Sequence, residues 1–290
     1  MSSILEKTAL PDSGTGSGQH SKSVSIAIWG SAGSGKTMLA INLAFELARL
    51  GKKVLLVDAD LKRPSVASWL ALTNSGPGLT AALRLANQNR LEISEIIRLS
   101  AELKFEKSKL DVLTGLSHPN RWAEVSSESL ATLIECASTH FDFLVFDLSE
   151  DFDLRPPIQS SSATLNSATE LVVSSATFVV ALFSAEPVGV NRFLFDIQQL
   201  EREVWLVANR VGPKHLGKPS PKELRETLAK FTSSPIRSWL PADFVSTESS
   251  ISHARPLLLE YPNAKLTLAI RALAGQIVDE GLTRLDSKGG

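Results

Sequence analysis

The feature that most constrains this 290-residue chain is a glycine-rich loop set between two different hydrophobic patterns. The run VSIAIW, from Val24 to Trp29, is continuously apolar, as expected of a strand covered on both faces. The sequence GSAGSGKT follows from Gly30 to Thr37, and leucines between Leu39 and Leu50 then recur every three or four residues. The sequence therefore predicts a strand, a phosphate-binding loop and a helix in direct succession.

Each residue type in the loop suits the binding of phosphate. Gly30, Gly33 and Gly35 permit tight turns that aim backbone N–H groups at phosphate oxygens, and the following helix adds its positive N-terminal end. Lys36 is expected to reach the β- and γ-phosphates of a nucleotide, and Thr37 to place its hydroxyl on Mg²⁺. We predict nucleotide contacts from Gly30, Ser31, Ala32, Gly33, Ser34, Gly35, Lys36, Thr37 and Met38.

Aspartates stand at the ends of two further predicted strands. The run KVLLVD ends at Asp58, with Asp60 two residues on, and FDFLVFD ends at Asp147. Ligands of open α/β sheets lie at the carboxyl ends of the strands. Asp58 and Asp60 are therefore candidates to coordinate Mg²⁺ through water or to orient an attacking water. Asp147 matches the second acid that holds the metal in phosphate-loop NTPases.

The remaining apolar runs alternate with helical patterns, which is the signature of βαβ units. We predict one doubly wound α/β domain with a mostly parallel sheet of about seven strands. The polar segment 149–169 is expected to be a mobile loop that leads into a helix. Strands are predicted at Val24–Trp29, Lys53–Asp58, Leu110–Gly115, Phe141–Asp147, Phe178–Ser184, Val204–Asn209 and Ile236–Leu240.

Composition sets limits on the function and on the domain boundaries. The formal net charge of −1 gives no general electrostatic signal for nucleic acid or an anionic membrane. A single cysteine, Cys136, excludes an intrachain disulfide and suits a reducing compartment. We expect a disordered tail over residues 1–22, a folded domain over 23–280 and a flexible polar tail over 281–290. No transmembrane segment or membrane anchor is evident, so a cytoplasmic protein is expected, peripheral at the membrane or pole only through a partner.

The order of these motifs resembles the ParA/MinD branch of phosphate-loop ATPases. The resemblance rests on SAGSGKTMLAINLAFELARLGKKVLLVDADL, then FDFLVFD, then VWLVANRV. The later stretch LPADFVSTESSISHARPLLLEYPNAKLTLAIRALA looks most like the CpaE/TadZ group of pilus-assembly proteins in its actinobacterial form. The likeness covers residues 24–277, and the phosphate-loop motif is the part that is specific by itself.

The resemblance implies roles for particular residues, with ATP and Mg²⁺ as cofactors. Lys36 and Asp60 would be catalytic, with Asp60 positioning water. Asn209 would hydrogen-bond the adenine edge, with Arg210 nearby and the backbone at Pro241 closing the base pocket. The metal would be held by Thr37, Asp60 and Asp147.

One loop position departs from the family pattern. ParA-like proteins usually carry a second lysine that reaches across an ATP-dependent homodimer to the partner's phosphates, and this chain has Ser31 there. Serine cannot supply the positive charge that stabilises the transferred phosphoryl group. The sequence therefore predicts slow hydrolysis and weakens the case for the dimer, although CpaE/TadZ-type members also tend to lack this lysine.

Two alternatives to a positioning or assembly switch remain open. One is a scaffold that binds nucleotide without hydrolysing it and recruits a protein partner. The other is a phosphotransferase like the bacterial tyrosine kinases, because VDADLKRPSVASWL is very like their acidic motif. Those kinases phosphorylate tyrosines in a tail, whereas the single tyrosine of this chain, Tyr261, lies in an internal segment. The implied setting is pilus assembly, secretion or cell division, with an unknown partner.

Overall fold

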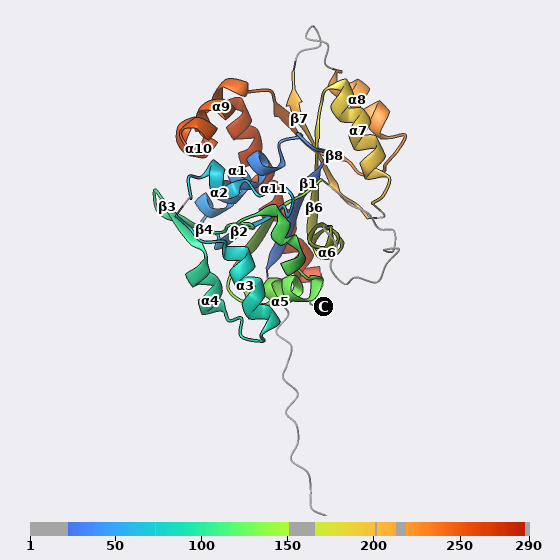
Figure 1. The fold of residues 1–290 in the computed structure, drawn as a ribbon. Helices are drawn as coiled ribbons and strands as arrows, with labels where there is room; N and C mark the ends of the chain where they lie inside the picture. Colours follow the sequence, from blue (N-terminus) through green and yellow to red (C-terminus); the bar gives the residue numbers. More distant parts are fainter. Residues whose placement is uncertain (1–22, 73, 151–165, 201, 213–218, 288–290) are drawn as a thin grey trace, which may run out of the picture.

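An eight-stranded sheet with the strand order β3-β4-β2-β5-β1-β6-β7-β8 forms the centre of the protein (Figure 1). The computed structural model describes residues 23–72, 74–150, 166–200, 202–212 and 219–287. All neighbouring strands pair in parallel except β3 and β4. The strands are β1 Val24–Gly30, β2 Val54–Ala59, β3 Ala101–Phe105, β4 Ser108–Leu113, β5 Phe143–Leu148, β6 Phe178–Ser184, β7 Trp205–Val211 and β8 Ile236–Pro241.

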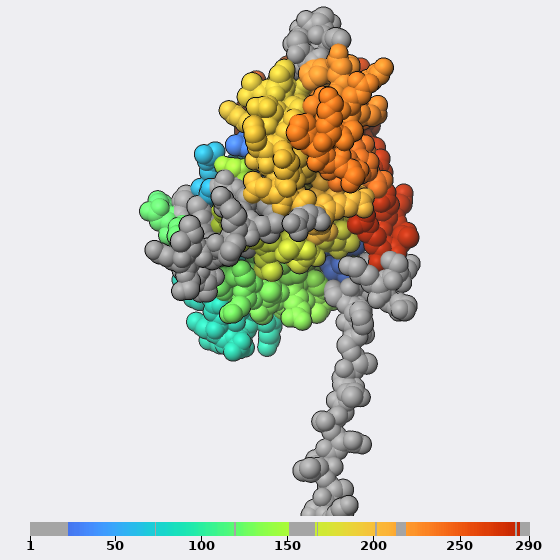
Figure 2. Space-filling model, turned by 90° about the vertical axis from the view of Figure 1, so that its right-hand side faces the viewer, coloured from blue at the N-terminus to red at the C-terminus, as the bar shows by residue number. Residues whose placement is uncertain are grey.

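Helices cover both faces of the sheet, as a parallel sheet requires. One buried cluster joins one face of the sheet to helices α3 to α8, and a second joins the other face to α1, α10 and α11. Figure 2 shows the side on which α7 and α8 lie above α5. The helices are α1 Lys36–Arg49, α2 Val66–Trp69, α3 Gly78–Asn87, α4 Ile93–Leu99, 3-10 helix η1 Pro119–Glu124, α5 Ser127–Ser138, α6 Ser167–Ser175, α7 Pro187–Ile197, α8 Pro221–Leu228, α9 Phe244–Ser252, α10 Leu257–Glu260 and α11 Lys265–Ser287.

Each of the seven predicted strands is present, which confirms the predicted fold class. The eighth, β3, is an antiparallel edge strand that the sequence analysis missed. It joins β4 through the two residues Glu106 and Lys107, and Glu106 has φ of 49°. Positive φ is usual in a two-residue hairpin turn, but the Asn-Gly or Asp-Gly signal that announces such turns is absent here.

Helix α1 ends just before a glycine and is tied by two buried polar side chains to the C-terminal helices. Gly51 follows the helix with φ of 78°, as expected of the glycine that ends a helix. The buried Asn42 side chain accepts a 2.7 Å hydrogen bond from the Leu257 backbone N–H, which ties α1 to α10. The buried Glu46 carboxylate pairs with Arg271 of α11 at 3.2 Å. These contacts fix the helix that carries Lys36 and Thr37.

The C-terminal boundary predicted at residue 280 falls inside α11, which continues to Ser287. Gly281 is buried, and a β-carbon there would lie 3.1 Å from the Val24 side chain. The Arg284 guanidinium donates to the Thr177 carbonyl at 3.1 Å and lies over the Phe178 ring. Gly281 and Arg284 therefore pack against β1 and β6, and the helix continues past the predicted start of the flexible tail. The predicted tail 1–22 and most of the predicted loop 149–169 lie outside the described residues. Within the described part of the chain, no helix is both long enough and apolar enough to cross a membrane.

Candidate functional site

The glycine loop between β1 and α1 has a backbone that suits the approach of phosphate. Gly30 has φ of 152°, and a β-carbon there would lie 1.9 Å from the Leu182 carbonyl oxygen of β6. Gly33 and Gly35 have φ of 72° and 98°, which side chains rarely allow. Lys36 and Thr37 then open α1, where free N–H groups and the helix dipole favour an anion. The loop glycines are thus required by geometry at Gly30 and Gly35.

Asn209, at the carboxyl end of β7, braces this loop. Its amide nitrogen donates to the Ser34 carbonyl at 2.7 Å, and its amide oxygen accepts from the Arg210 N–H at 2.8 Å. Any β-carbon on Gly35 would lie 2.6 Å from that amide nitrogen. Because Asn209 is 4% exposed and its amide is engaged at both ends, its evident task is to fix the loop. Its predicted contact with adenine stays a prediction.

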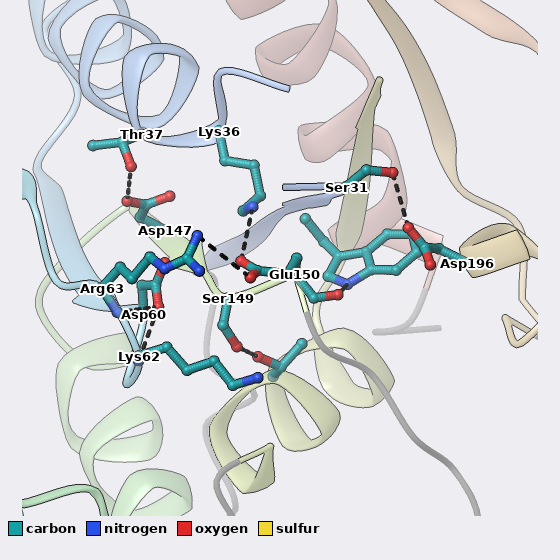
Figure 3. A network of polar contacts seen from close by, with 12 residues as sticks. Ser31, Lys36, Thr37, Asp60, Lys62, Arg63, Asp147, Ser149, Glu150 and Asp196 are labelled. Carbon is teal, nitrogen blue, oxygen red and sulfur yellow. Dashed lines mark hydrogen bonds and ion pairs between the residues drawn. The ribbon is translucent and has the colours of Figure 1, made fainter. Parts of the chain in front are cut away.

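Thr37 and Asp147 meet at the site as predicted from their motifs. The Thr37 hydroxyl donates to Asp147 Oδ2 at 2.6 Å (Figure 3). It also lies 3.1 Å from the Ser65 hydroxyl. Asp147 is fully buried near the end of β5, and its other oxygen, Oδ1, has no hydrogen-bond partner among the described residues. Burial raises the pKa of Asp147 from 3.8 to about 7, and the nearby Asp60 charge adds to the rise.

Asp58 and Asp60 flank Ala59 at the end of β2, beside β5. Asp58 lies opposite Asp147 in the register of these parallel strands. Burial, followed by the charge of Asp147, raises the pKa of Asp58 well above its usual value. Asp58 Oδ2 accepts from the Val66 N–H at 3.0 Å. Asp60 Oδ1 instead accepts from the N–H groups of Lys62 and Arg63, which makes it the anchor of its own turn.

These groups fit a hydrated divalent cation better than a site made only of protein ligands. No group of three or more His, Cys, Asp or Glu side chains in the described ranges is arranged to hold a metal by itself. Mg²⁺ ordinarily takes one or two carboxylates, a hydroxyl, water and phosphate oxygens. The unpartnered Asp147 Oδ1 beside the Thr37 hydroxyl suits that ion. Lys36, Thr37, Asp60 and Asp147 thus come together at one sheet edge.

Glu150, which the sequence analysis did not single out, lies within this group. Its carboxylate is 3.7 Å from Lys36 Nζ and 3.9 Å from Arg63 Nη1 (Figure 3). Its main-chain carbonyl accepts a 3.2 Å hydrogen bond from the indole N–H of Trp29, which is fully buried. The position of Glu150, three residues beyond Asp147, could have drawn notice because it lies at the same sheet edge.

Ser31, at the position of the family's second lysine, contacts an acid from α7. Its hydroxyl donates to Asp196 Oδ2 at 2.8 Å. Burial raises the pKa of the Asp196 carboxyl, while the Ser31 hydrogen bond and the Lys36 charge oppose that rise. Asp196 was also missed, because no sequence signal links α7 to the loop. Two carboxylates, Glu150 and Asp196, thus lie close to the phosphate loop.

The remaining predicted nucleotide contacts lie around the loop with different exposures. Met38 is buried in the α1 core, so only its backbone is available. Arg210 has φ of 57°, and its guanidinium lies over the Phe244 ring at 5.9 Å. Pro241 ends β8 and lies opposite Val211 of β7. The structure therefore brings Asn209, Arg210 and Pro241 to neighbouring strand ends.

A cleft of about 630 Å³ lies beside the Asp60 turn. Gly115 forms part of its wall, and a β-carbon there would lie 2.9 Å from the Asp58 carboxyl carbon. Arg63 also lines the cleft, so it belongs both to the cleft and to the ion pair with Glu150. Any rearrangement of Glu150 would therefore alter the pairing of a cation that lines the cleft.

A comparison with protein families shows which family the chain belongs to. Residues 26–254, well over half of the chain, match the model of the CobQ/CobB/MinD/ParA nucleotide binding domain. The chain belongs to this family. This confirms the ParA/MinD-level resemblance, whereas the CpaE/TadZ subgroup remains a hypothesis.

Among curated proteins, the antiactivator FleN of Pseudomonas aeruginosa is 26% identical over 89% of this chain and 87% of its own length. The tyrosine-protein kinase YwqD of Bacillus subtilis is 37% identical, but over only 40% of this chain and 45% of its own.

Two solved structures share the fold at low sequence identity. A ParA family ATPase from Chlorobium tepidum superposes with a TM-score of 0.70 and 18% identity, over 87% of this chain and 98% of its own. MinD from Pyrococcus horikoshii, complexed with Mg-ADP, gives a TM-score of 0.65 and 18% identity, over 88% and 94%. The nucleotide and Mg²⁺ predicted from the loop agree with the family and with this complex.

Proposed function

We propose that this protein binds Mg·ATP at the loop between β1 and α1, hydrolyses it slowly, and uses the bound nucleotide as a switch for a protein partner. The observation that carries the proposal is the meeting of Lys36, Thr37, Asp60 and Asp147 at the carboxyl edge of the sheet. In particular, Thr37 and Asp147 are already hydrogen-bonded at 2.6 Å on α1 and β5.

Each of these side chains has a task that its surroundings support. Lys36 is 8% exposed and supplies a desolvated positive charge for phosphate oxygens. Thr37 and Asp147 would hold Mg²⁺, which neutralises phosphate charge when it is bound. Asp60 would orient the attacking water, since the turn that it anchors fixes its carboxylate near Asp147. Asn209 keeps the loop in shape through Ser34.

The switch role rests on similarity to named proteins rather than on the chemistry of the site. FleN is named an antiactivator, and the curated relatives also include septum site-determining MinD proteins. Both names describe proteins that act on other machinery. For this chain we propose a spatial or assembly role of the same kind, in pilus assembly, secretion or division, within the CpaE/TadZ group. The proposed location is cytoplasmic, with a partner recruiting it to the membrane or pole.

A nucleotide-bound scaffold is the second candidate, and a specific contact favours it. Ser31 replaces the family's second lysine, and its hydroxyl is bound by Asp196, so an acid stands where a cation would assist phosphoryl transfer. A tyrosine-kinase activity has less support, because the Tyr261 hydroxyl donates to the Ser249 hydroxyl at 2.9 Å and is not a free acceptor for phosphate.

The deciding experiment measures ATP binding, ATP hydrolysis and solution mass for the unmodified chain and for Asp60→Asn. Asparagine keeps an oxygen that can anchor the turn at Lys62 and Arg63 but loses the negative charge. We expect Mg·ATP affinity to change by less than about threefold, and hydrolysis to fall by roughly 100-fold. If Mg·ATP alone produces a dimer, the dimer should last longer in Asp60→Asn, because the bound ATP is hydrolysed more slowly. Asp279→Asn, at an exposed position on α11, is the matched control.

Each result separates the candidates. Binding without any hydrolysis in the unmodified chain would support the scaffold and overturn the enzyme. Hydrolysis that survives Asp60→Asn at full rate would remove Asp60 from the mechanism. A solution mass that does not change when nucleotide is bound would rule out the dimer switch. It would not bear on the proposed ATP hydrolysis. Failure of the unmodified chain to bind Mg·ATP would overturn the proposal as a whole.

A further inference from the structure

Glu150 places a negative charge against the lysine that the phosphate loop needs for a nucleotide. Lys36 is 8% exposed and the Glu150 side chain 19% exposed, so their 3.7 Å ion pair is largely shielded from water. Shielded charges interact more strongly than exposed ones, where an ion pair contributes little. The other cation of this group, Arg63, is 75% exposed and adds less.

The backbone that carries Glu150 is anchored by a hydrogen bond to a buried side chain of β1. Strand β5 ends at Leu148, and the Trp29 indole holds the Glu150 carbonyl against β1. The carboxylate lies between Lys36 of the loop and Arg63 of the Asp60 turn (Figure 3). Asp196 approaches the loop from α7 but binds Ser31 instead, so among the described side chains it is Glu150 that forms the ion pair with Lys36.

The ionisation of Glu150 agrees with this arrangement. Burial would raise the pKa of its carboxyl, but its own backbone N–H and the charges of Lys36, Arg63 and Lys62 outweigh burial and lower it. The group is therefore charged at neutral pH. A phosphate oxygen that approaches Lys36 meets a carboxylate that must share the lysine or leave it.

We propose that Glu150 sets the selectivity of this site between nucleoside diphosphate and triphosphate, by competing with the terminal phosphate for Lys36. This rests on the proposed nucleotide binding. A loop lysine of this type reaches the β- and γ-phosphates, so a triphosphate brings its extra charge to the lysine that Glu150 occupies. A diphosphate lacks that group and leaves the ion pair with less competition.

The competition links the nucleotide to the neighbouring cleft. When the carboxylate yields Lys36 to a phosphate, it also gives up Arg63, which lines the cleft. Binding of the triphosphate therefore frees a cation beside the Asp60 turn, and diphosphate does so less. Glu150 would in this way also transmit the presence of the γ-phosphate to the cleft, through its contact with Arg63.

The test compares the affinities of Mg·ADP and of the non-hydrolysable triphosphate Mg·AMPPNP, by calorimetry, for the unmodified chain and for Glu150→Gln. Glutamine keeps the size of the side chain and removes its charge. We expect affinity for Mg·AMPPNP to rise by about tenfold and affinity for Mg·ADP to rise by less than about threefold. Glu102→Gln, on the exposed edge strand β3, makes the same change in net charge and should alter neither affinity.

The outcomes are distinct. An unchanged ratio of the two affinities in Glu150→Gln, with both nucleotides bound, would overturn the competition and leave the nucleotide site standing. Weaker binding of Mg·AMPPNP would show that Glu150 assists the triphosphate, which also overturns it. An equal shift in Glu102→Gln would assign the effect to net charge rather than to Glu150. If the unmodified chain binds neither nucleotide, the proposed function itself fails.

Discussion

At the scale of single residues, Asp147 is under two opposing demands. A buried carboxylate is costly when charged, yet a cation site needs that charge. Its neighbours Asp58 and Asp60 add repulsion, and the Thr37 hydroxyl relieves only one of its two oxygens. Function at this position therefore opposes stability, as is common where polar groups are held ready for a ligand.

This opposition gives a pH-dependent prediction for Asp147→Asn. The pKa of Asp147 is about 7 in the folded chain and 3.8 ordinarily, so the folded state binds the proton more tightly. The stability contributed by this group is therefore present at low pH and is lost as pH rises from about 4 to 7. Without Mg²⁺ and nucleotide, Asp147→Asn should raise the free energy of unfolding at pH 8 by on the order of a few kcal/mol.

Urea unfolding at pH 5.5 and pH 8 measures the effect. The gain should shrink at the lower pH, and Mg²⁺-dependent nucleotide binding should weaken in the same variant. Asp279→Asn, at an exposed carboxylate, should show no such pH dependence. An Asp147→Asn protein that is less stable at pH 8 than the unmodified chain would contradict the raised pKa.

At the scale of elements, the sequence predicts what is locally encoded. Continuous apolar runs identified seven strands, and the glycine loop identified the start of α1, because both signals lie within a few neighbouring residues. Strand β3 was missed because its turn lacks the usual residues. Glu150 and Asp196 were missed because their contacts to Lys36 and Ser31 join residues more than a hundred positions apart. The adenine role given to Asn209 came from family resemblance, and its clamp on Ser34 was not foreseen.

The end of α11 gives a prediction at this scale. A chain that stops at Glu280 loses the charged hydrogen bond from Arg284 to the Thr177 carbonyl and the contact of Arg284 with the Phe178 ring. Together these should cost about 2 kcal/mol, which for a chain of this size lowers the melting temperature by roughly 4–8 °C. Thermal unfolding measures it, and Arg284→Ala in the full chain should reproduce most of the loss. An unchanged melting temperature would restore the predicted boundary at residue 280.

At the scale of the whole molecule, the site draws on elements from both layers of the fold. Strand β1 lies between β5 and β6, with β2 beyond β5 and β7 beyond β6. Lys36 and Thr37 come from α1, which packs on one face, whereas Asp196 comes from α7, which packs on the other. The aspartates come from β2 and β5, and the Asn209 clamp from β7. Such a site is assembled only when the sheet and both helical layers are in place.

A ligand at such a site must stabilise the folded chain as a whole. If Mg·ADP binds only the folded state, a concentration of 100 times its dissociation constant adds about 2.7 kcal/mol to the free energy of unfolding. For a domain of this size the melting temperature should then rise by roughly 5–10 °C. The rise should fall when EDTA removes Mg²⁺, because Thr37 and Asp147 would then hold no cation to neutralise the phosphate charge. Lys36→Ala should abolish the rise, measured against its own ligand-free melting temperature. A rise that persists in Lys36→Ala would place the nucleotide elsewhere on the molecule, and the loop would no longer be the binding site.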